Sequence, residues 1–263
     1  MTSTPKQAPL PGTRPKGVRD EHEAAACVRD MFTRVAPRYD FLNHLLSFSL
    51  DRVWRRRTAK KFLHVLGRPH ARVLDLCSGT GDLAFALDRA RTSALRGPQG
   101  EGAQIFGSDF VEPMLTRARE KAHVGHHAVL LAAADALHLP FPDASFDLVT
   151  TAFGFRNLAN YEDGLREFAR VLKQGGELGI LEFTEPLSGP MAGLFRFYFK
   201  NLLPYIGAAV SGSREAYAYL PKSVSGFPSP PDLSTLLERC GFGDVRFASW
   251  NFGSVILHSA RRV

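Results

Sequence analysis

A glycine-rich string, VLDLCSGTGDLA at residues 73–84, lies between a predicted buried strand and a predicted helix. Gly79 and Gly81 have no Cβ, so the backbone can approach a ligand closely there, and the first N–H groups of the helix are free to bind it. Asp75 lies near the end of the strand. The pattern is typical of a loop that holds a nucleotide or nucleoside at the carboxyl edge of a parallel sheet. The simpler interpretation is a tight turn between strand and helix.

Two further carboxylates are expected at the same edge. Asp109 ends the strand-like run AQIFGSD, 28 residues after Gly81, and an acid at this place can accept hydrogen bonds from both hydroxyls of a ribose. Asp135 follows a third run, HAVLLAAAD, where it could accept a hydrogen bond from an adenine amino group. Asp109 could instead cap the helix that follows it. Three acids at three strand ends favour the nucleoside site.

Strand-like and helix-like segments alternate from residue 71 onward, which predicts βαβ units and a parallel sheet covered on both faces. Two or three helices are expected before them, with a break at Pro37. The helix from Tyr161 is expected to reach Lys173 and to end at Gln174-Gly175-Gly176. The last two strand-like runs, joined at 251–253, predict an antiparallel hairpin.

The domain organisation follows from these segments. Residues 1–20 are polar and rich in Pro and Gly, so we expect a disordered basic arm there. Residues 21–263 are expected to form one domain. Its parts are helices covering the site (21–70), a cofactor-binding core (71–185), an apolar helical cap (186–230), and a closing helix and strands (231–263).

The positive charge of the chain is concentrated near its start. The whole chain has 33 Lys and Arg against 26 Asp and Glu, a net charge of +7, and residues 1–70 have 14 against 6, a net of +8. Six of these residues cluster on one predicted helix: Arg52, Arg55, Arg56, Arg57, Lys60 and Lys61. Nucleic acid, an anionic membrane surface and solubility are each compatible with such a cluster.

Composition argues against several other classes of protein. No run approaches 18 uncharged apolar residues, so no membrane-spanning helix is predicted. Cys27, Cys77 and Cys240 are odd in number and far apart, so neither a disulfide framework nor a zinc site is expected. The spacing of His, Asp and Glu suggests no other metal site. The first residues lack the apolar stretch of a secretory signal, which favours a cytoplasmic protein.

Three segments resemble the UbiE/MenG family of quinone-ring C-methyltransferases, at residues 32–56, 73–84 and 151–183. The R-Y-D-x-x-N string at 38–43 and the F-G-x-R-N string at 153–157 are more specific than the glycine loop. The resemblance implies the α/β fold of class I S-adenosylmethionine-dependent methyltransferases. That fold is Rossmann-like, with a mostly parallel sheet of seven strands and a C-terminal antiparallel hairpin.

The resemblance also implies S-adenosylmethionine as methyl donor, S-adenosylhomocysteine as product, and no metal. Together with the nucleoside pattern it suggests ten cofactor-binding residues: Asp75, Gly79, Thr80, Gly81, Asp109, Phe110, Met114, Asp135, Ala136 and Ala152. Four residues are expected on the reacting side. Arg156, which stays charged, would stabilise a developing phenolate, and Asn157 would orient it. Tyr39 and Asp40 would close the site, with Asp40 a candidate proton acceptor. Arg156 could instead be structural, and Tyr39 and Asp40 a hinge.

The implied reaction is C-methylation of a prenylated hydroquinone, either demethylmenaquinol to menaquinol or the methoxy-benzoquinol step toward ubiquinone. The segment 186–220 would hold the prenyl tail, through Phe195, Phe197, Phe199, Leu202, Leu203, Tyr205 and Ile206. Its apolar face could equally pack on the sheet, meet the membrane or pair two subunits in a homodimer. A bilayer substrate favours transient docking of the basic cluster on the inner face of the membrane. An RNA methyltransferase and a non-catalytic nucleoside-binding scaffold are the alternatives, but RNA binding would require aromatic residues among the basic ones.

Overall fold

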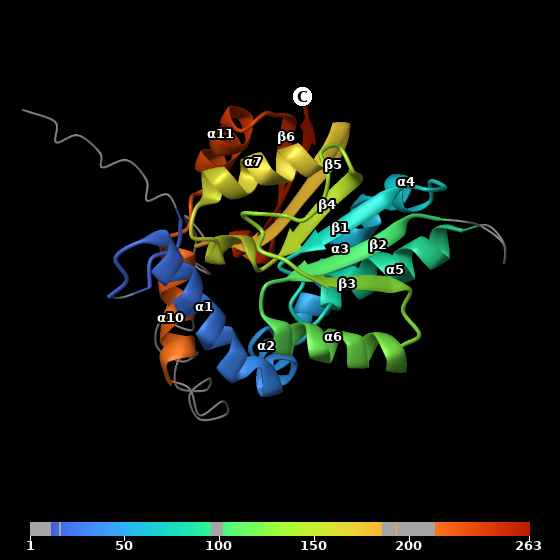
Figure 1. Cartoon of the computed structure of the whole chain (residues 1–263). Helices are drawn as coiled ribbons and strands as arrows, with labels where there is room; N and C mark the ends of the chain where they lie inside the picture. The colour runs from blue at the N-terminus through green and yellow to red at the C-terminus, as the bar shows by residue number, and fades with distance from the viewer. Residues whose placement is uncertain (1–11, 16, 96–101, 186–192, 194–213) are drawn as a thin grey trace, which may run out of the picture.

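A seven-stranded sheet lies at the centre of the computed structural model, which describes residues 12–15, 17–95, 102–185, 193 and 214–263 (Figure 1). Its strands are ordered β3-β2-β1-β4-β5-β7-β6, with β1 to β5 parallel and β7 antiparallel to β5 and β6. They are β1 (Arg72–Leu76), β2 (Gln104–Asp109), β3 (Val129–Ala133), β4 (Phe146–Ala152), β5 (Leu172–Phe183), β6 (Phe242–Trp250) and β7 (Val255–Arg262). The predicted sheet and its closing hairpin are confirmed.

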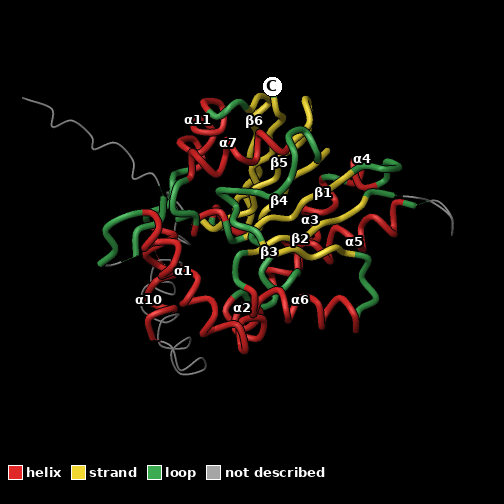
Figure 2. Tube along the Cα trace, in the orientation of Figure 1, coloured by secondary structure: helices red, strands yellow, loops and turns green. Residues whose placement is uncertain are grey.

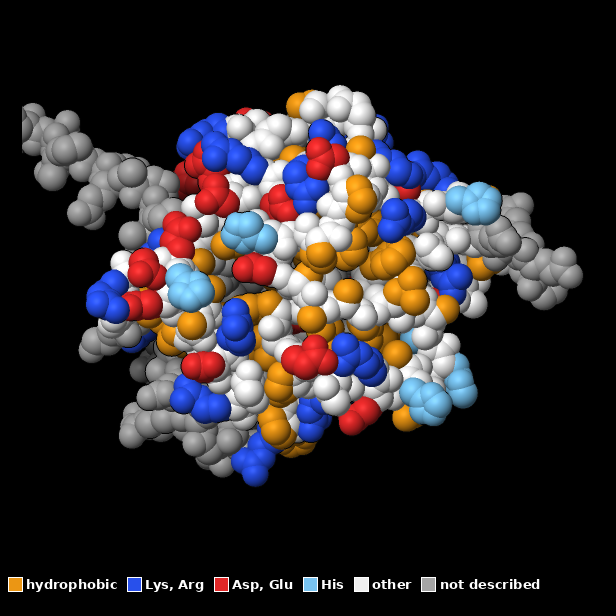
Figure 3. All heavy atoms as spheres, in the orientation of Figure 1, with side chains coloured by type: hydrophobic (Ala, Val, Ile, Leu, Met, Phe, Trp, Pro, Cys, Tyr) orange, Lys and Arg blue, Asp and Glu red, His pale blue; other side chains and the backbone are white. Residues whose placement is uncertain are grey.

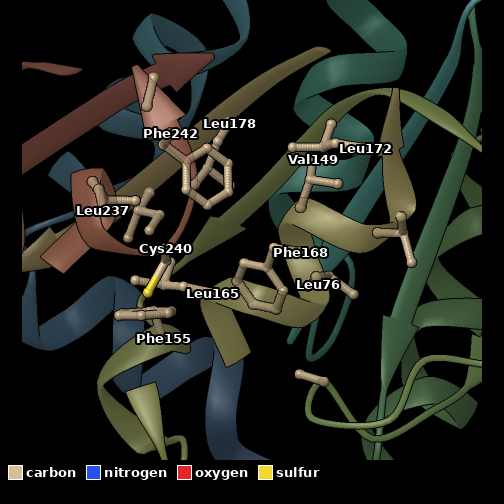
Figure 4. Packing of buried hydrophobic residues seen from close by; sticks show 14 of the residues in the cluster. Leu76, Val149, Phe155, Leu165, Phe168, Leu172, Leu178, Leu237, Cys240 and Phe242 are labelled. Carbon is tan, nitrogen blue, oxygen red and sulfur yellow. The ribbon is translucent and has the colours of Figure 1, made fainter. Parts of the chain in front are cut away.

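Helices cover both faces of this sheet (Figure 2). Alternate residues of a strand point to opposite faces, and β1 shows the consequence. Val73 packs with Phe62, which follows α3 (Leu50–Lys61), and with Leu83 at the start of α5. Leu74 packs instead with Phe168 of α7. Figure 4 shows this second cluster, in which α7 and α11 cover the sheet. The helices are α5 (Asp82–Ala94), α6 (Glu112–Val124), α7 (Tyr161–Val171) and α11 (Pro230–Arg239).

Among the described residues, four α-helices precede the first strand, where two or three were expected. They are α1 (Glu21–Val35), α2 (Tyr39–Leu46), α3 (Leu50–Lys61) and α4 (Leu63–Leu66), and a 3₁₀ turn (Ala36–Arg38) carries the predicted break at Pro37. The extra divisions have local causes. Phe48 and Ser49 both adopt positive φ, which separates α2 from α3, and Phe62 leaves helical geometry between α3 and α4.

One predicted boundary is wrong by two residues. Helix α7 ends at Val171 rather than at Lys173, because Leu172 is already extended, with φ −73° and ψ 142°. Leu172 is fully buried in the core. The strand β5 therefore begins at once and includes the Gln174-Gly175-Gly176 sequence, where Gly175 takes a positive φ of 71°.

The expectation of a disordered arm over residues 1–20 does not hold for residues 12–15. The backbone N–H of Thr13 donates to the carbonyl oxygen of Leu158 (2.8 Å), and Arg14 donates to the carbonyl oxygen of Ala159 (2.7 Å).

Helix α10 (Arg214–Ser225) follows the predicted apolar segment in the chain. The seven residues expected to hold a prenyl tail, between 195 and 206, lie outside the described residues. Within the described part of the chain, no helix is long and apolar enough to cross a membrane.

Candidate active site

The glycine string forms the turn between β1 and α5, as expected. Gly79 and Gly81 have φ of 55° and 87°, in the left-handed region that favours glycine. A Cβ on Gly81 would lie 2.5 Å from the ring of Phe85, so only glycine fits there. Cys77 also takes a positive φ, of 51°. This strain in a residue with a side chain is typical of a functional turn.

Asp109 joins the end of β2 to this turn. Its carboxylate accepts hydrogen bonds from the backbone N–H of Gly79 (2.8 Å) and of Val111 (2.9 Å). It does not cap α6 as the alternative interpretation expected, because the N-cap is Val111 and no side chain caps this helix. At the start of α6, Asp109 holds only the backbone N–H of Val111, and it also lines the main cavity. Burial raises the pKa of Asp109 to about 6, although the N–H groups of Val111, Gly79 and Phe110 favour its ionised form. A donor pair such as the two hydroxyls of a ribose would stabilise this carboxylate further.

The main cavity encloses about 730 Å³, including the space open to solvent, and lies at the carboxyl edge of β1, β2 and β4. This is the size of a small-molecule site. Its walls include seven of the ten predicted cofactor residues: Gly79, Asp109, Phe110, Met114, Asp135, Ala136 and Ala152. The continuation of the same cavity is lined by Ala25, Val28 and Phe32 of α1, and by Tyr39, Phe153 and Asn157. Acids and apolar side chains thus line one space, and α1 packs against Phe110 and Met114 there.

The other three predicted cofactor residues lie beneath or beside this cavity. Asp75 is buried and accepts a hydrogen bond from the hydroxyl of Thr150 (2.8 Å), and burial raises its pKa to about 7. A small cavity beside the glycine turn, lined by Asp75, Thr80 and Tyr39, adjoins the main one. Gly81 forms the turn itself. These three residues therefore support the glycine turn rather than line the main cavity.

Tyr39, the first residue of α2, lines both the main cavity and the small cavity beside the glycine turn. Its ring lies over the glycine turn, 3.9 Å from the position of a Cβ on Gly79. Burial raises the pKa of Tyr39, while a hydrogen bond with Asn43 and the charges of Arg156 and Arg55 oppose that rise. The phenol therefore stays protonated at neutral pH. That Tyr39 and Asp40 close the site stays a prediction.

Asp40 points away from the main cavity. Its carboxylate accepts a hydrogen bond from the hydroxyl of Thr80 and pairs with the ammonium of Lys121 (2.9 Å). Lys121 also pairs with Asp82 (2.6 Å), in the first turn of α5. Asp40 is absent from the walls of the main cavity. The structure therefore gives it the role of tying α2 to the glycine turn, rather than that of a proton acceptor.

Arg156 lies in the turn of the F-G-x-R-N string but is also buried outside the main cavity. Its guanidinium donates to both oxygens of Glu182 (3.1 and 2.9 Å) and to the carbonyl oxygen of Phe153. The next residue, Asn157, does line the cavity. Arg156 therefore fixes this turn against β5. The positive charge of Arg156 acts on the site by opposing the rise in the pKa of Tyr39.

Three residues near the site were not singled out in the sequence. Glu182 is the buried partner of Arg156, and burial raises its pKa against the effect of that pairing. The hydroxyl of Tyr219 donates to the side-chain oxygen of Asn157 (3.1 Å) and shares a hydrogen bond with Thr13 (2.8 Å). Neither Thr13 nor Tyr219 has a local pattern that reveals this contact, because 206 residues separate them in the chain.

A cluster of possible metal ligands lies behind the glycine turn. One atom each of His44, Asp51 and Asp82 come within 4.8 Å of one another. However, the guanidinium of Arg55 hydrogen-bonds to Asp51 and lies 3.7 Å from Asp82. A cation of the chain itself thus already neutralises these carboxylates. The spacing of Asp51 and Arg55, four residues apart on a helix, is the sequence signal for this pair.

Comparison with known proteins decides the family. The sequence profile of the ubiE/COQ5 methyltransferase family matches residues 18–262. The chain belongs to this family. Two similar relatives are the demethylmenaquinone methyltransferases of Deinococcus radiodurans, 47% identical over 90% of this chain and 92% of the relative, and of Thermus thermophilus, 46% identical over 88% and 100%. The ubiquinone/menaquinone biosynthesis C-methyltransferase UbiE of Geobacter sulfurreducens is 40% identical over 89% and 88%.

Solved structures agree on the fold. A SAM-dependent methyltransferase from Aquifex aeolicus superposes with a TM-score of 0.54 at 22% identity, over 78% of this chain and 89% of that one. The [4+2]-cyclase SpnF superposes with a TM-score of 0.62 at 16% identity, over 97% and 99%. The fold is thus that of class I methyltransferases. Since it also serves a cyclase, the fold alone does not specify the reaction.

Proposed function

We propose that this ubiE/COQ5-family methyltransferase transfers a methyl group from S-adenosylmethionine to a ring carbon of a prenylated hydroquinone, converting demethylmenaquinol to menaquinol. The observation that carries the proposal is the main cavity, whose walls combine the acids Asp109 and Asp135 with apolar side chains of α1. The names of the relatives at 46–47% identity support this acceptor.

The predicted cofactor residues that line the main cavity fit S-adenosylmethionine. Asp109 offers carboxylate oxygens for the ribose hydroxyls, and Asp135, beyond β3, lies where an adenine would reach it. Phe110, Met114 and Ala136 supply the apolar walls for a purine ring. Gly79 lines the cavity, and without a Cβ it leaves the space beneath the ring of Tyr39 for the amino-acid part. Bound in this place, the cofactor supplies an electrophilic methyl group.

The apolar residues in the walls of the main cavity suit an aromatic acceptor. A ring carbon becomes nucleophilic when a neighbouring phenol oxygen carries negative charge, so the protein must stabilise that oxygen and hold the ring in line. Tyr39 is protonated and faces the site, and the amide of Asn157 lies on the same walls. We assign these two side chains to the developing phenolate, whose proton passes to water. As the new carbon–carbon bond forms, the bond between the methyl group and sulfur would break, and the hydrogen on the methylated ring carbon would then move to the oxygen through water, so that one proton is released overall. Arg156 is a positioning residue that acts through the turn carrying Asn157, and Val28 and Phe32 exclude water.

The alternative acceptor is the methoxy-benzoquinol of ubiquinone biosynthesis, which the name of the Geobacter relative includes. Protein incubated with methyl-labelled cofactor and, separately, a short-chain demethylmenaquinol, a short-chain methoxy-benzoquinol and bulk RNA would distinguish the three. We expect label in the naphthoquinol first. Label only in RNA would refute the proposal, and cofactor binding without any label would favour a binding scaffold.

A prenylated substrate lies in a bilayer, so the enzyme must reach the membrane surface. We propose that it works in the cytoplasm and contacts the inner face of the membrane transiently. The basic cluster of α3 was expected to make this contact, but its six members do not act together. Arg55 is buried in the ion pairs behind the glycine turn, and Arg57 lies over the ring of Trp250 at 5.9 Å. The remaining cations require a closer description.

A further inference from the structure

A second cavity lies on the far side of the contact between Asp40 and Lys121. It encloses about 2380 Å³, measured like the main cavity, and lies among α2, α3, α5 and the end of α6. It has Arg55 and Asp82 in common with the small cavity beside the glycine turn. No part of the proposed mechanism uses it.

Four cations line this cavity without a carboxylate partner among the described residues. Arg52, Arg56 and Lys60 are spaced four residues apart, so they share one face of α3, and Arg89 faces them from α5. All four are exposed. Arg55 and Lys121 line the same cavity but are already paired with acids. The exposed Glu120 also lines it, so the four cations outnumber this further acid. Over the face of the molecule in Figure 3, by contrast, acidic and basic side chains are interspersed.

Exposed apolar side chains adjoin the cavity-lining residues along the chain. Phe41, Leu45, Phe48 and Leu50 are all exposed, and they alternate in sequence with the cavity-lining residues Asp40, His44 and Ser49. Val124, which is 79% exposed, lies on the cavity wall. Phe48 is 76% exposed and has a positive φ of 52°, a costly backbone conformation for a bulky residue. The four residues Phe41, Leu45, Phe48 and Leu50 are called the rim.

We propose that this cavity and its apolar rim form a docking site for a bilayer of anionic phospholipid. The four cations would hold lipid phosphates, and the rim formed by Phe41, Leu45, Phe48 and Leu50 would enter the interface between headgroups and acyl chains. Leu45 and Leu50, beside the two phenylalanines, suit the rim to acyl chains, and RNA is the other outcome that the test below distinguishes. The inference rests on the proposed function only in that the substrate is a membrane lipid.

The position of this surface explains how the substrate would reach the site. Helix α2 joins the two places, because Tyr39 in its first turn lines the main cavity while Asp40 and His44 line the basic one. A bilayer bound at the rim would therefore lie beside the N-terminal cover of the active site.

Sedimentation with vesicles tests the proposal. Wild-type protein should sediment with vesicles of phosphatidylcholine containing phosphatidylglycerol, but not with phosphatidylcholine alone, and added salt should release it. The double substitution Arg52→Ala and Arg56→Ala should weaken binding by about fivefold per cation removed. Arg57→Ala with Lys61→Ala is the matched control, since it removes the same charge from the same helix outside the cavity.

A second pair of variants tests the rim. Phe48→Ser should weaken vesicle binding, whereas Phe252→Ser should not, although Phe252 is also 76% exposed and has a positive φ of 57°. Equal loss in test and control variants, or wild-type binding to RNA but not to vesicles, would overturn the proposal. Methylation of a short-chain quinol without vesicles should be unchanged by Arg52→Ala with Arg56→Ala. A wild-type protein that binds vesicles but methylates no quinol would refute only the proposed function.

Discussion

Protonation of Asp109 should weaken cofactor binding at a pH where most carboxylates are still ionised. Burial raises the pKa of this carboxyl to about 6 in the protein without ligand. Ribose hydroxyls donate hydrogen bonds to the ionised form, so the affinity should fall as the pH falls through that value. For a pKa near 6, the dissociation constant should be about tenfold higher at about pH 5 than at about pH 7.

Isothermal titration calorimetry with S-adenosylhomocysteine over this pH range measures the effect. Asp109→Asn should weaken binding by about tenfold to a hundredfold at neutral pH, because hydrogen bonds to a charged acceptor contribute about 1.5–3 kcal/mol. It should also remove the pH dependence. Asp75→Asn is the matched control. Asp75 is a buried acid with a pKa raised to about 7 but lies outside the main cavity, so the tenfold change should remain.

The contribution of Asp109 to the stability of the unliganded protein should change with pH in the opposite sense. A carboxyl whose pKa is raised by folding is protonated more readily in the folded state, so between about pH 4 and 6 this contribution to the free energy of unfolding, measured as the difference from Asp109→Asn, should fall as the pH rises. A dissociation constant that stays the same from pH 5 to pH 7 in folded wild-type protein would refute this account of Asp109. An Asp109→Asn variant with wild-type affinity would do the same.

Three further substitutions test the walls of the site. Arg156→Ala leaves Glu182 buried without its partner, so urea unfolding should show a loss of about 3–5 kcal/mol; replacing the pair together by Arg156→Met with Glu182→Leu should cost clearly less, and equal losses would contradict this. Gly154→Ala would place a Cβ against that of Cys77 and should lower stability by about 1–3 kcal/mol in thermal unfolding; in a Cys77→Gly background the loss should shrink, and an unchanged loss would locate the clash elsewhere. Tyr39→Phe should reduce kcat by roughly a hundredfold with unchanged affinity for S-adenosylhomocysteine, because only the hydroxyl is removed; unaltered kcat would exclude this phenol from the chemistry.

Local pattern was sufficient to predict the sheet and the glycine turn. Apolar residues on both faces, as at Val73, Leu74 and Leu76 of β1, are typical of strands buried on both faces, and Gly79 and Gly81 come soon after that strand, so sequence order fixes their place. The helix boundary at Leu172 was missed because burial in the core, rather than local propensity, makes that residue extended.

The part of the site around Arg156 and Tyr219 depends on contacts between residues that are distant in the chain. The sequence alone suggested that Arg156 faces the substrate, but the carboxylate that pairs with it, Glu182, comes from the end of β5. The hydrogen bond between Thr13 and Tyr219 joins opposite ends of the chain, and no periodicity reports it. Arg55 was assigned to a surface cluster by its charge, although Asp51 four residues earlier indicated a local ion pair.

The central claim is that the main cavity directs a methyl group onto carbon of a quinol ring. The most direct measurement is mass spectrometry of the product formed from short-chain demethylmenaquinol and cofactor with a deuterated methyl group, before and after mild oxidation. C-methylation leaves both hydroxyls free, so we predict a labelled product that oxidises to the quinone and keeps its label on the ring. A labelled product that resists oxidation would show methylation on oxygen. That result, or no labelled quinol from protein that binds the cofactor, would contradict the account.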